Sequence, residues 1–152
     1  MEQFVIKQAS FLTSVGQQGN YPEEKPCEIA IVGKSNVGKS SLINKLCNNG
    51  KLAKTSATPG KTRLINYFLL NREFYLVDLP GYGFAKASKG EQESWGSLIE
   101  QYLQSGRVKH LFMLIDIRHA PTEEDRTMYK WLLYYGVPFT LIATKSDKIA
   151  VS

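Results

Sequence analysis

Apolar residues along this chain occur with two different spacings, and the first marks the expected strands. The continuous apolar runs at 29–32 and 111–115 are typical of strands that are buried on both faces of a sheet. Two further runs, separated by the tight turn Asn71-Arg72, predict a hairpin. A last run precedes a polar turn and predicts another buried strand. We therefore expect strands at 29–32, 64–70, 73–78, 111–115 and 138–144.

Three other stretches carry apolar residues three and four positions apart, the period of a helix with one buried face. Asn48-Asn49-Gly50 ends the first stretch, and Gly106 and Gly136 end the other two. The third opens with Thr122-Glu123-Glu124-Asp125, a capping box. The apolar positions are Leu42, Ile43, Leu46 and Cys47 in the first, Trp95, Leu98, Ile99, Tyr102 and Leu103 in the second, and Met128, Trp131, Leu132 and Tyr135 in the third.

The alternation of strands and helices predicts an α/β fold. We expect three layers (αβα), with a mostly parallel sheet that contains one antiparallel hairpin strand. The loops at the carboxyl ends of parallel strands meet in one crevice, so the loops after residues 32, 78 and 144 should converge. We expect residues 1–27 to form an N-terminal leader that packs on one domain, which is formed by residues 28–152.

The loop after the first strand, Gly33-Lys34-Ser35-Asn36-Val37-Gly38-Lys39-Ser40, has the pattern G-x-x-x-x-G-K-S of a phosphate-binding P-loop. Gly33 and Gly38 let the backbone turn and approach a ligand without a Cβ in the way. Lys39 offers a positive charge to the β and γ phosphates, and Ser40 offers a hydroxyl to Mg²⁺. The motif predicts a P-loop NTPase, but it does not specify the base.

Two further loops narrow this prediction. Asp78 follows an apolar strand, which is the position of a Walker-B carboxylate that holds Mg²⁺ through water. Gly81 offers a backbone N–H to a γ-phosphate. Thr144-Lys145-Ser146-Asp147 matches the guanine-reading pattern [N/T]-K-x-D. A carboxylate at Asp147 can accept two hydrogen bonds from guanine, whereas adenine has no such pair of donors. A P-loop ATPase or kinase is the alternative, and Lys145 and Asp147 argue against it.

Composition and charge indicate where the protein acts and what it could bind. The chain has 152 residues, the size of one domain, and lacks an apolar run long enough to cross a bilayer and a secretory signal, so we expect a cytoplasmic monomer. The net charge is +5, and ten Lys and Arg residues stand against two acidic residues between positions 34 and 89. Part of this charge is expected to face nucleic acid or, equally well, to form a solvated basic face. The residues concerned are Lys51, Lys54, Arg63, Arg72, Lys86 and Lys89.

The motifs together resemble one family, the EngB/YsxC (YihA) GTPases of the TRAFAC class, which are linked to assembly of the large ribosomal subunit in bacteria. The resemblance covers nearly the whole chain. It is carried by the P-loop through Ser41, Thr58-Pro59-Gly60-Lys61-Thr62, Leu64-Ile65-Asn66, Asp78-Leu79-Pro80-Gly81-Tyr82-Gly83, Asp116-Ile117-Arg118-His119 and Thr144-Lys145-Ser146-Asp147-Lys148.

The resemblance implies a Ras-like G domain that binds GTP or GDP with Mg²⁺, hydrolyses GTP, and acts on the large ribosomal subunit and its rRNA, and hence in growth and cell division. Residues 60–64 would form switch I, with Thr62 as a ligand of Mg²⁺ beside Ser40 and Asp78, and 78–81 would lead switch II. The implied nucleotide contacts are Gly33, Lys34, Ser35, Asn36, Val37, Gly38, Lys39, Ser40, Ser41, Gly60, Lys61, Thr62, Arg63, Leu64, Asp78, Leu79, Pro80, Gly81, Thr144, Lys145, Ser146, Asp147 and Lys148. For Lys61 and Arg63, contact with RNA is the open alternative.

The source of catalysis is left open by the sequence. Tyr82 stands where many GTPases carry a glutamine that orients the attacking water, so we expect slow intrinsic hydrolysis. The candidates for a catalytic role are Asn36, Lys39, Thr62 and Gly81. In related GTPases an asparagine at the position of Asn36 accompanies potassium dependence; the alternative is that Asn36 only stabilises its loop. Arg118 and His119 are more simply structural.

The family pattern continues beyond Ser152 with another strand, a serine-containing loop that contacts guanine, and a helix. We therefore expect a C-terminally incomplete G domain whose last strand lies at the edge of the sheet. A second functional reading is a nucleotide-gated module that binds ribosomes or RNA and hydrolyses GTP only incidentally.

Overall fold

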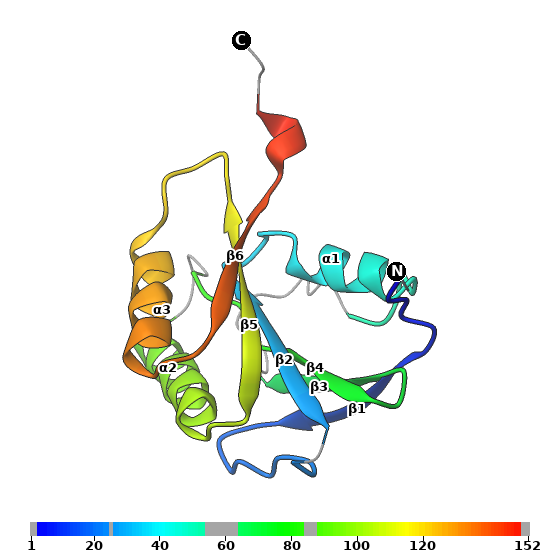
Figure 1. Ribbon diagram of the computed structural model, residues 1–152. Coiled ribbons are helices and arrows are strands. Elements are labelled where there is room, and N and C mark those ends of the chain that lie inside the picture. The colour runs from blue at the N-terminus through cyan, green and yellow to red at the C-terminus, as the bar shows by residue number, and fades with distance from the viewer. Residues whose placement is uncertain (1–2, 25, 54–63, 84–87, 150–152) are drawn as a thin grey trace.

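The computed structural model describes residues 3–24, 26–53, 64–83 and 88–149, and these form one sheet of six strands in the order β1-β3-β4-β2-β5-β6 (Figure 1). β2 is parallel to β4 and β5, and β6 is parallel to β5. β3 is antiparallel to both of its neighbours. The strands are β1 (Ala9–Val15), β2 (Cys27–Gly33), β3 (Ile65–Leu70), β4 (Phe74–Asp78), β5 (Val108–Asp116) and β6 (Phe139–Thr144). The predicted α/β class and its antiparallel hairpin are confirmed.

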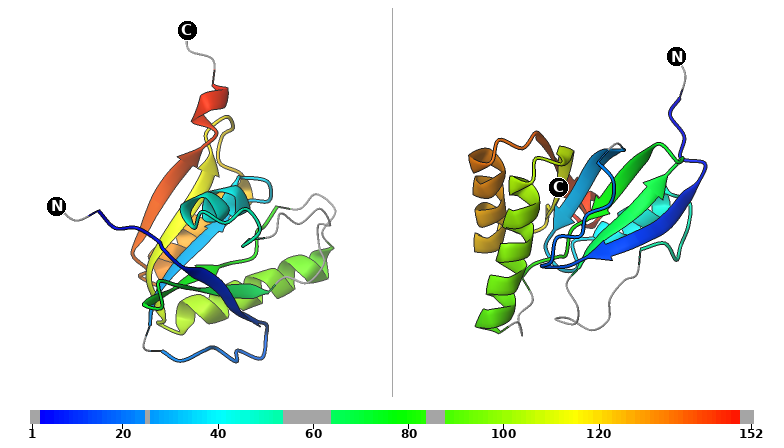
Figure 2. Two further views of the ribbon diagram at one scale, coloured as in Figure 1. Left: turned by 90° about the vertical axis from the view of Figure 1, so that its right-hand side faces the viewer. Right: turned by 90° about the horizontal axis from the view of Figure 1, so that it is seen from below.

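Helices cover both faces of the sheet, which gives the expected three layers. Helix α1 (Lys39–Leu46) lies on one face, and α2 (Lys89–Gln104) and α3 (Glu123–Tyr134) lie side by side on the other, as Figure 1 and the right-hand view of Figure 2 show. Each face has its own apolar cluster: Ile43 of α1 packs with Ile31 and Leu114, whereas Ile99 of α2 and Met128 of α3 pack in the other cluster. None of the helices in the described ranges is long and apolar enough to cross a bilayer.

Each helix has a defined start, and that of α3 is the one that the sequence predicts. Thr122 and Asp125 form both bonds of the capping box of α3, because the Asp125 N–H donates to Thr122 Oγ1 (3.1 Å) and the Thr122 N–H donates to Asp125 Oδ2 (2.9 Å). Ser88 caps α2 by accepting from the Glu91 N–H (3.1 Å). Helix α1 starts directly from the glycine-bounded loop, with Gly38 at a φ of 106°.

Two strands differ from the sequence prediction. The first, β1, lies in the leader, where the sequence analysis assigned no element, and it pairs with β3 at one edge of the sheet. The Asn71 side chain in the β3–β4 turn extends this attachment, because it accepts from the Lys7 N–H (2.7 Å) and donates to the Val5 carbonyl (2.9 Å).

The second, β6, was predicted to be buried, and that prediction is wrong. It pairs only with β5 and forms the other edge, so its residues are exposed or half-buried, and Leu141 is 49% exposed. The expectation that the last strand lies at the edge of the sheet is confirmed.

A buried ion pair fixes the amino end of β2. Glu28 is 2% exposed, and its carboxylate accepts from Arg107 Nε (2.7 Å) and from the hydroxyls of Tyr67 and Tyr102 (2.9 Å each). Arg107 also donates to the carbonyl of Pro22 (2.6 Å), which ties the end of the leader to the sheet. Burial and the neighbouring carboxylate raise the pKa of both tyrosines far above the usual range.

Candidate nucleotide-binding site

The P-loop joins β2 to α1 and packs against the loop that follows β4. The Ser35 N–H donates to the carbonyl of Tyr82 (2.7 Å), and Lys34 and Tyr82 form a parallel bridge. Gly33 is required sterically, because a Cβ there would lie 2.7 Å from Cγ1 of Val37. A Cβ at Gly81 would come within 3.3 Å of the Gly33 carbonyl oxygen. The two loops therefore touch backbone to backbone at their glycines.

Lys39 and Asp78 meet where β4 and α1 approach each other. The lysine is the first residue of α1 and the aspartate is the last residue of β4, and their side chains form an ion pair that is largely buried. Ser40 follows Lys39 in the first turn of α1 and is half-buried, whereas Ser41 is exposed. A hydroxyl and a carboxylate on adjoining elements, beside a lysine and a helix N-terminus, form an arrangement that suits a phosphate with its magnesium ion.

The loop after β6 reaches back to the P-loop. Thr144 Oγ1 donates to the carbonyl of Val37 (2.8 Å), and Lys145 Nζ donates to the carbonyl of Asn36 (2.6 Å). The predicted convergence of the loops after β2, β4 and β6 is thus confirmed. The P-loop backbone at Asn36 has a φ of 67°, which places its carbonyl within reach of the lysine.

Asp147 lies just beyond this contact, in the 3-10 turn η1 (Ser146–Lys148). Its side chain is 76% exposed, and within the described residues it has one ion pair, with Lys148 at 3.9 Å. The carboxylate that the sequence assigns to the base is therefore accessible to a ligand. Whether Asp147 reads guanine stays a prediction.

Asp116 belongs to one of the motifs that carry the family resemblance, but no role at the site was predicted for it. Its carboxylate forms a bidentate pair with Arg118, with N···O distances of 3.0 and 2.8 Å, and it lies 3.5 Å from Lys145 Nζ. The hydrogen bond from Arg118 holds the pKa of Asp116 well below its usual range. Arg118 is thereby a support of the lysine loop, in agreement with its expected structural role. The signals for Asp116 in the sequence were its place in that motif and its position directly after a buried strand.

Tyr82 points away from the P-loop. The side chain is 2% exposed, its hydroxyl donates to the carboxylate of Asp125 in α3, and its ring packs edge-on against Trp95 with 5.3 Å between ring centroids. Burial, and then the bond to Asp125, raise the pKa of Tyr82 far above its usual range. A side chain in this orientation does not reach a γ-phosphate held by the P-loop.

The remaining predicted contacts are placed as follows. Leu79 is buried and its N–H donates to the carbonyl of Ile31 (3.0 Å), and the carbonyl of Pro80 accepts from Trp95 Nε1 (2.7 Å). Leu64 is half-buried directly before β3. The predictions for Gly60, Lys61, Thr62 and Arg63, and for the basic residues Lys54 and Lys86, fall outside the described residues.

The three-layer fold, with a P-loop between β2 and α1 and a lysine–aspartate loop after β6 docked on it, defines a P-loop nucleotide-binding protein. The sequence profile of the family described as "50S ribosome-binding GTPase" matches residues 28–145. A protein of Clostridium kluyveri named probable GTP-binding protein EngB is 57% identical over 148 residues, which are 97% of this chain and 75% of that protein. A protein of the same name from Clostridium perfringens is 57% identical over 146 residues, 95% of this chain and 74% of its own length.

Solved structures agree with this match. The crystal structure of a probable GTP-binding protein engB superposes with a TM-score of 0.70 at 27% identity, over 82% of this chain and 74% of that one. Era of Aquifex aeolicus bound to GDP and AlF4⁻ superposes with a TM-score of 0.60 at 26% identity, over 84% of this chain and 43% of that one. The chain belongs to the EngB family of GTP-binding proteins, and it is a GTPase.

Proposed function

We propose that this GTPase is a molecular switch in the assembly of the large ribosomal subunit, and through that step in bacterial growth and cell division. The observation that carries the proposal is the match of residues 28–145 to a family described as binding the 50S ribosome. A structural neighbour, Era, has been solved in complex with MgGDPNP and a segment of 16S ribosomal RNA. Lys45, Lys51 and Arg72 are exposed on this chain and offer positive charge to rRNA. The switch is proposed to act in the cytoplasm as a monomer.

In this proposal the P-loop holds the phosphates of GTP, and the loop after β6 reads the base through Asp147. Lys39 neutralises charge on the β and γ phosphates, and Gly81 presents a backbone N–H to the γ-phosphate. Ser40, Thr62 and, through water, Asp78 supply oxygen ligands, which are the type that Mg²⁺ prefers. Magnesium, when bound, adds positive charge beside the transferred phosphoryl group. Lys145 and Thr144 keep the base-reading loop in contact with the P-loop.

Hydrolysis by the isolated chain is proposed to be slow. Because Tyr82 is turned into the α2–α3 layer, no side chain at that position orients the attacking water. We propose that potassium, held near Asn36, supplies part of the missing charge. Asn36 is exposed, and its backbone is fixed by Lys145.

A second candidate function involves ribosome binding but does not require hydrolysis. In this reading the chain is a module that binds RNA or ribosomes when GTP is bound and releases them after incidental turnover. The orientation of Tyr82 favours this reading, since a slow enzyme can still act as a binding switch. A hydrolysis-deficient variant that completed subunit assembly and dissociated normally would support this second function.

The ribosomal proposal is tested by co-sedimentation of the chain with purified bacterial 50S subunits in sucrose gradients. Binding is expected with GDPNP and Mg²⁺, and to be weak with GDP. Binding should also fall steeply with salt, because rRNA contacts release counterions. Lys39→Ala is the control, since it keeps the exposed basic residues but weakens phosphate binding. Equal binding with GDPNP, with GDP and by the variant would contradict a nucleotide-controlled switch.

A further inference from the structure

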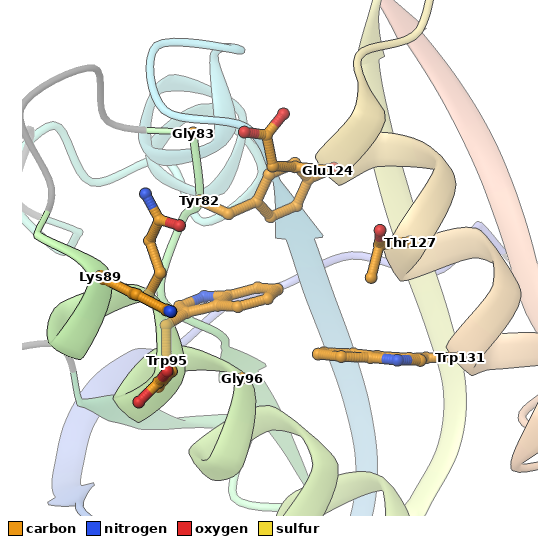
Figure 3. A pocket seen from close by; sticks show the side chains of 10 residues that line it. Tyr82, Gly83, Lys89, Trp95, Gly96, Glu124, Thr127 and Trp131 are labelled. Carbon is orange, nitrogen blue, oxygen red and sulfur yellow. The ribbon is translucent and has the colours of Figure 1, made fainter.

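A pocket of about 380 Å³ opens between α2 and α3, on the face of the sheet opposite α1 (Figure 3). Its walls are aromatic: Trp95 comes from α2, Trp131 comes from α3, and Tyr82 comes from the loop after β4. Lys89, Glu93 and Glu124 also line the pocket. The nucleotide site described above does not include this pocket, although the two share the segment that carries Tyr82.

The aromatic walls are held in place by contacts with the backbone and with each other. The indole rings of Trp95 and Trp131 are stacked, with 5.7 Å between centroids and 19° between planes. Trp95 is oriented by its hydrogen bond to the carbonyl of Pro80. Trp131 lies across Gly96, where a Cβ would be 3.4 Å from the indole. Since that distance is an ordinary van der Waals contact, the indole packs closely on the backbone of α2 at this glycine.

The charged groups at the pocket favour a cation. Glu93 and Glu124 have no hydrogen bond or ion pair within the described part of the chain, and they outnumber the one lysine of the lining. Figure 3 shows the Glu124 carboxylate beside the Tyr82 ring, above the two indoles. Because the whole chain has a net charge of +5, this acidic, aromatic pocket differs in sign from the rest of the molecule.

We propose that this pocket receives an arginine side chain from a basic protein partner. A planar guanidinium can lie against an indole face while its N–H groups pair with carboxylates, which a neutral aromatic or aliphatic side chain does not do. The phosphates of RNA would be repelled by Glu93 and Glu124, so the pocket fits a protein partner. Arginine is typical of the anchoring residues at protein interfaces.

The position of Tyr82 links the pocket to the nucleotide, and this part of the inference rests on the proposed function. Its ring is a wall of the pocket, while its backbone contacts Lys34 and Ser35 of the P-loop. If the loop after β4 moves between the GTP and GDP states, the shape of the pocket changes with it. By linkage, the arginine ligand and the nucleotide then change each other's affinity by the same factor.

The chain has two tryptophans, and both line the pocket, so its intrinsic tryptophan fluorescence reports directly on occupancy. The full chain is titrated with N-acetyl-arginine amide up to tens of millimolar, with NaCl adjusted to constant ionic strength. N-acetyl-lysine amide and N-acetyl-norleucine amide are the comparison probes. We expect a saturable change that is strongest for arginine, and no saturation with the norleucine derivative.

Glu93→Gln and Glu124→Gln should each weaken arginine binding by up to about fivefold, the effect expected for loss of one exposed carboxylate partner. Glu123→Gln is the matched control: it neutralises the adjacent residue of the same first turn of α3, but Glu123 is exposed and does not line the pocket. Circular dichroism melting curves establish that each variant is folded.

A linear, unsaturable response, equal effects of Glu123→Gln and Glu124→Gln, or tighter binding of the norleucine derivative would overturn the proposal. Calorimetry with GDP and GDPNP on the same samples separates the two claims. If the chain binds guanine nucleotide but not arginine, the proposed function stands and the proposed arginine site is refuted. If the chain binds arginine with the same affinity in both nucleotide states, the arginine site stands, but the proposed coupling between this site and the nucleotide is refuted.

Discussion

Replacing Tyr82 by phenylalanine removes one hydroxyl and leaves the ring against Trp95. In the structure this hydroxyl donates to the Asp125 carboxylate, and both residues are buried, at 2% and 6% exposed. Asp125 would keep its bond from the Thr122 N–H (2.9 Å), so the capping box of α3 should persist. The substitution therefore isolates the contact between the loop after β4 and α3.

The expected cost follows from the nature of the bond. Hydrogen bonds to charged groups contribute about 1.5–3 kcal/mol, and the burial of both residues argues against replacement by water. Tyr82→Phe should thus lower the free energy of unfolding by about 1.5–3 kcal/mol at neutral pH. The rate of GTP hydrolysis should stay within about twofold of the original, because the hydroxyl points away from the P-loop and a change of that size corresponds to well under 1 kcal/mol in the barrier.

The difference in the free energy of unfolding between the original chain and Tyr82→Phe should also depend on pH. The folded state raises the pKa of Tyr82 above its unfolded value near 10. A raised pKa stabilises the fold fully below the unfolded pKa, and this contribution is lost as the pH rises from about 10 toward the folded pKa. The stability difference between the original chain and Tyr82→Phe should therefore narrow above about pH 10.

Urea unfolding followed by circular dichroism measures both effects. Tyr129→Phe is the control, because Tyr129 is 42% exposed and no hydrogen bond of its hydroxyl is found in the described residues. A loss below about 0.5 kcal/mol for Tyr82→Phe, the range of ordinary surface substitutions, would refute the inferred contribution of this bond. A hydrolysis rate that changed tenfold would refute the orientation of Tyr82 away from the reaction.

Three further predictions concern other parts of the molecule. Glu28→Ala should destabilise the chain by about 3–5 kcal/mol in urea unfolding, because it leaves the buried guanidinium of Arg107 without its carboxylate; an effect under 1 kcal/mol would contradict this. Gly33→Ala should weaken GTP binding in calorimetry at least tenfold, since its Cβ would displace Val37 and the P-loop; unchanged affinity would show that the loop adjusts freely. Single-turnover hydrolysis should be faster in potassium than in sodium at equal ionic strength, and equal rates would remove the proposed role of Asn36.

Strands and helices with an uninterrupted apolar period could be predicted from the sequence. The errors concern β1 and β6, whose exposure depends on their positions in the sheet. β1 gave no clear signal because a bulge between Phe11 and Thr13 shifts its register against β3, and its edge position exposes both faces. β6 carries the apolar run 141–143, which resembles a strand buried on both faces, but the order of strands in the sheet leaves it with one neighbour. The edge position itself was expected, so only the burial of this strand was mispredicted.

The candidate site divides in the same way. The P-loop and the lysine–aspartate loop are contiguous motifs whose backbone geometry requires particular residues, so they could be found from the sequence. The contacts that support them join distant positions: Lys145 meets Asn36 across 109 residues, and Tyr82 meets Asp125 across 43. No spacing rule reaches that far, which is why the contact of Asp116 with Lys145 and the bond between Tyr82 and Asp125 appeared only in the structure.

The central claim, a guanine-specific P-loop switch read by Asp147, is tested most directly by ligand-dependent stability of the chain and of Asp147→Asn in Mg²⁺. At about one hundred times its Kd, a ligand adds roughly 2.7 kcal/mol to the free energy of unfolding. The account predicts this gain with GTP and GDP but not with ATP, and predicts that Asp147→Asn exchanges the GTP effect for one with xanthosine triphosphate. Equal stabilisation by ATP, or an Asp147→Asn variant that still prefers GTP, would contradict it.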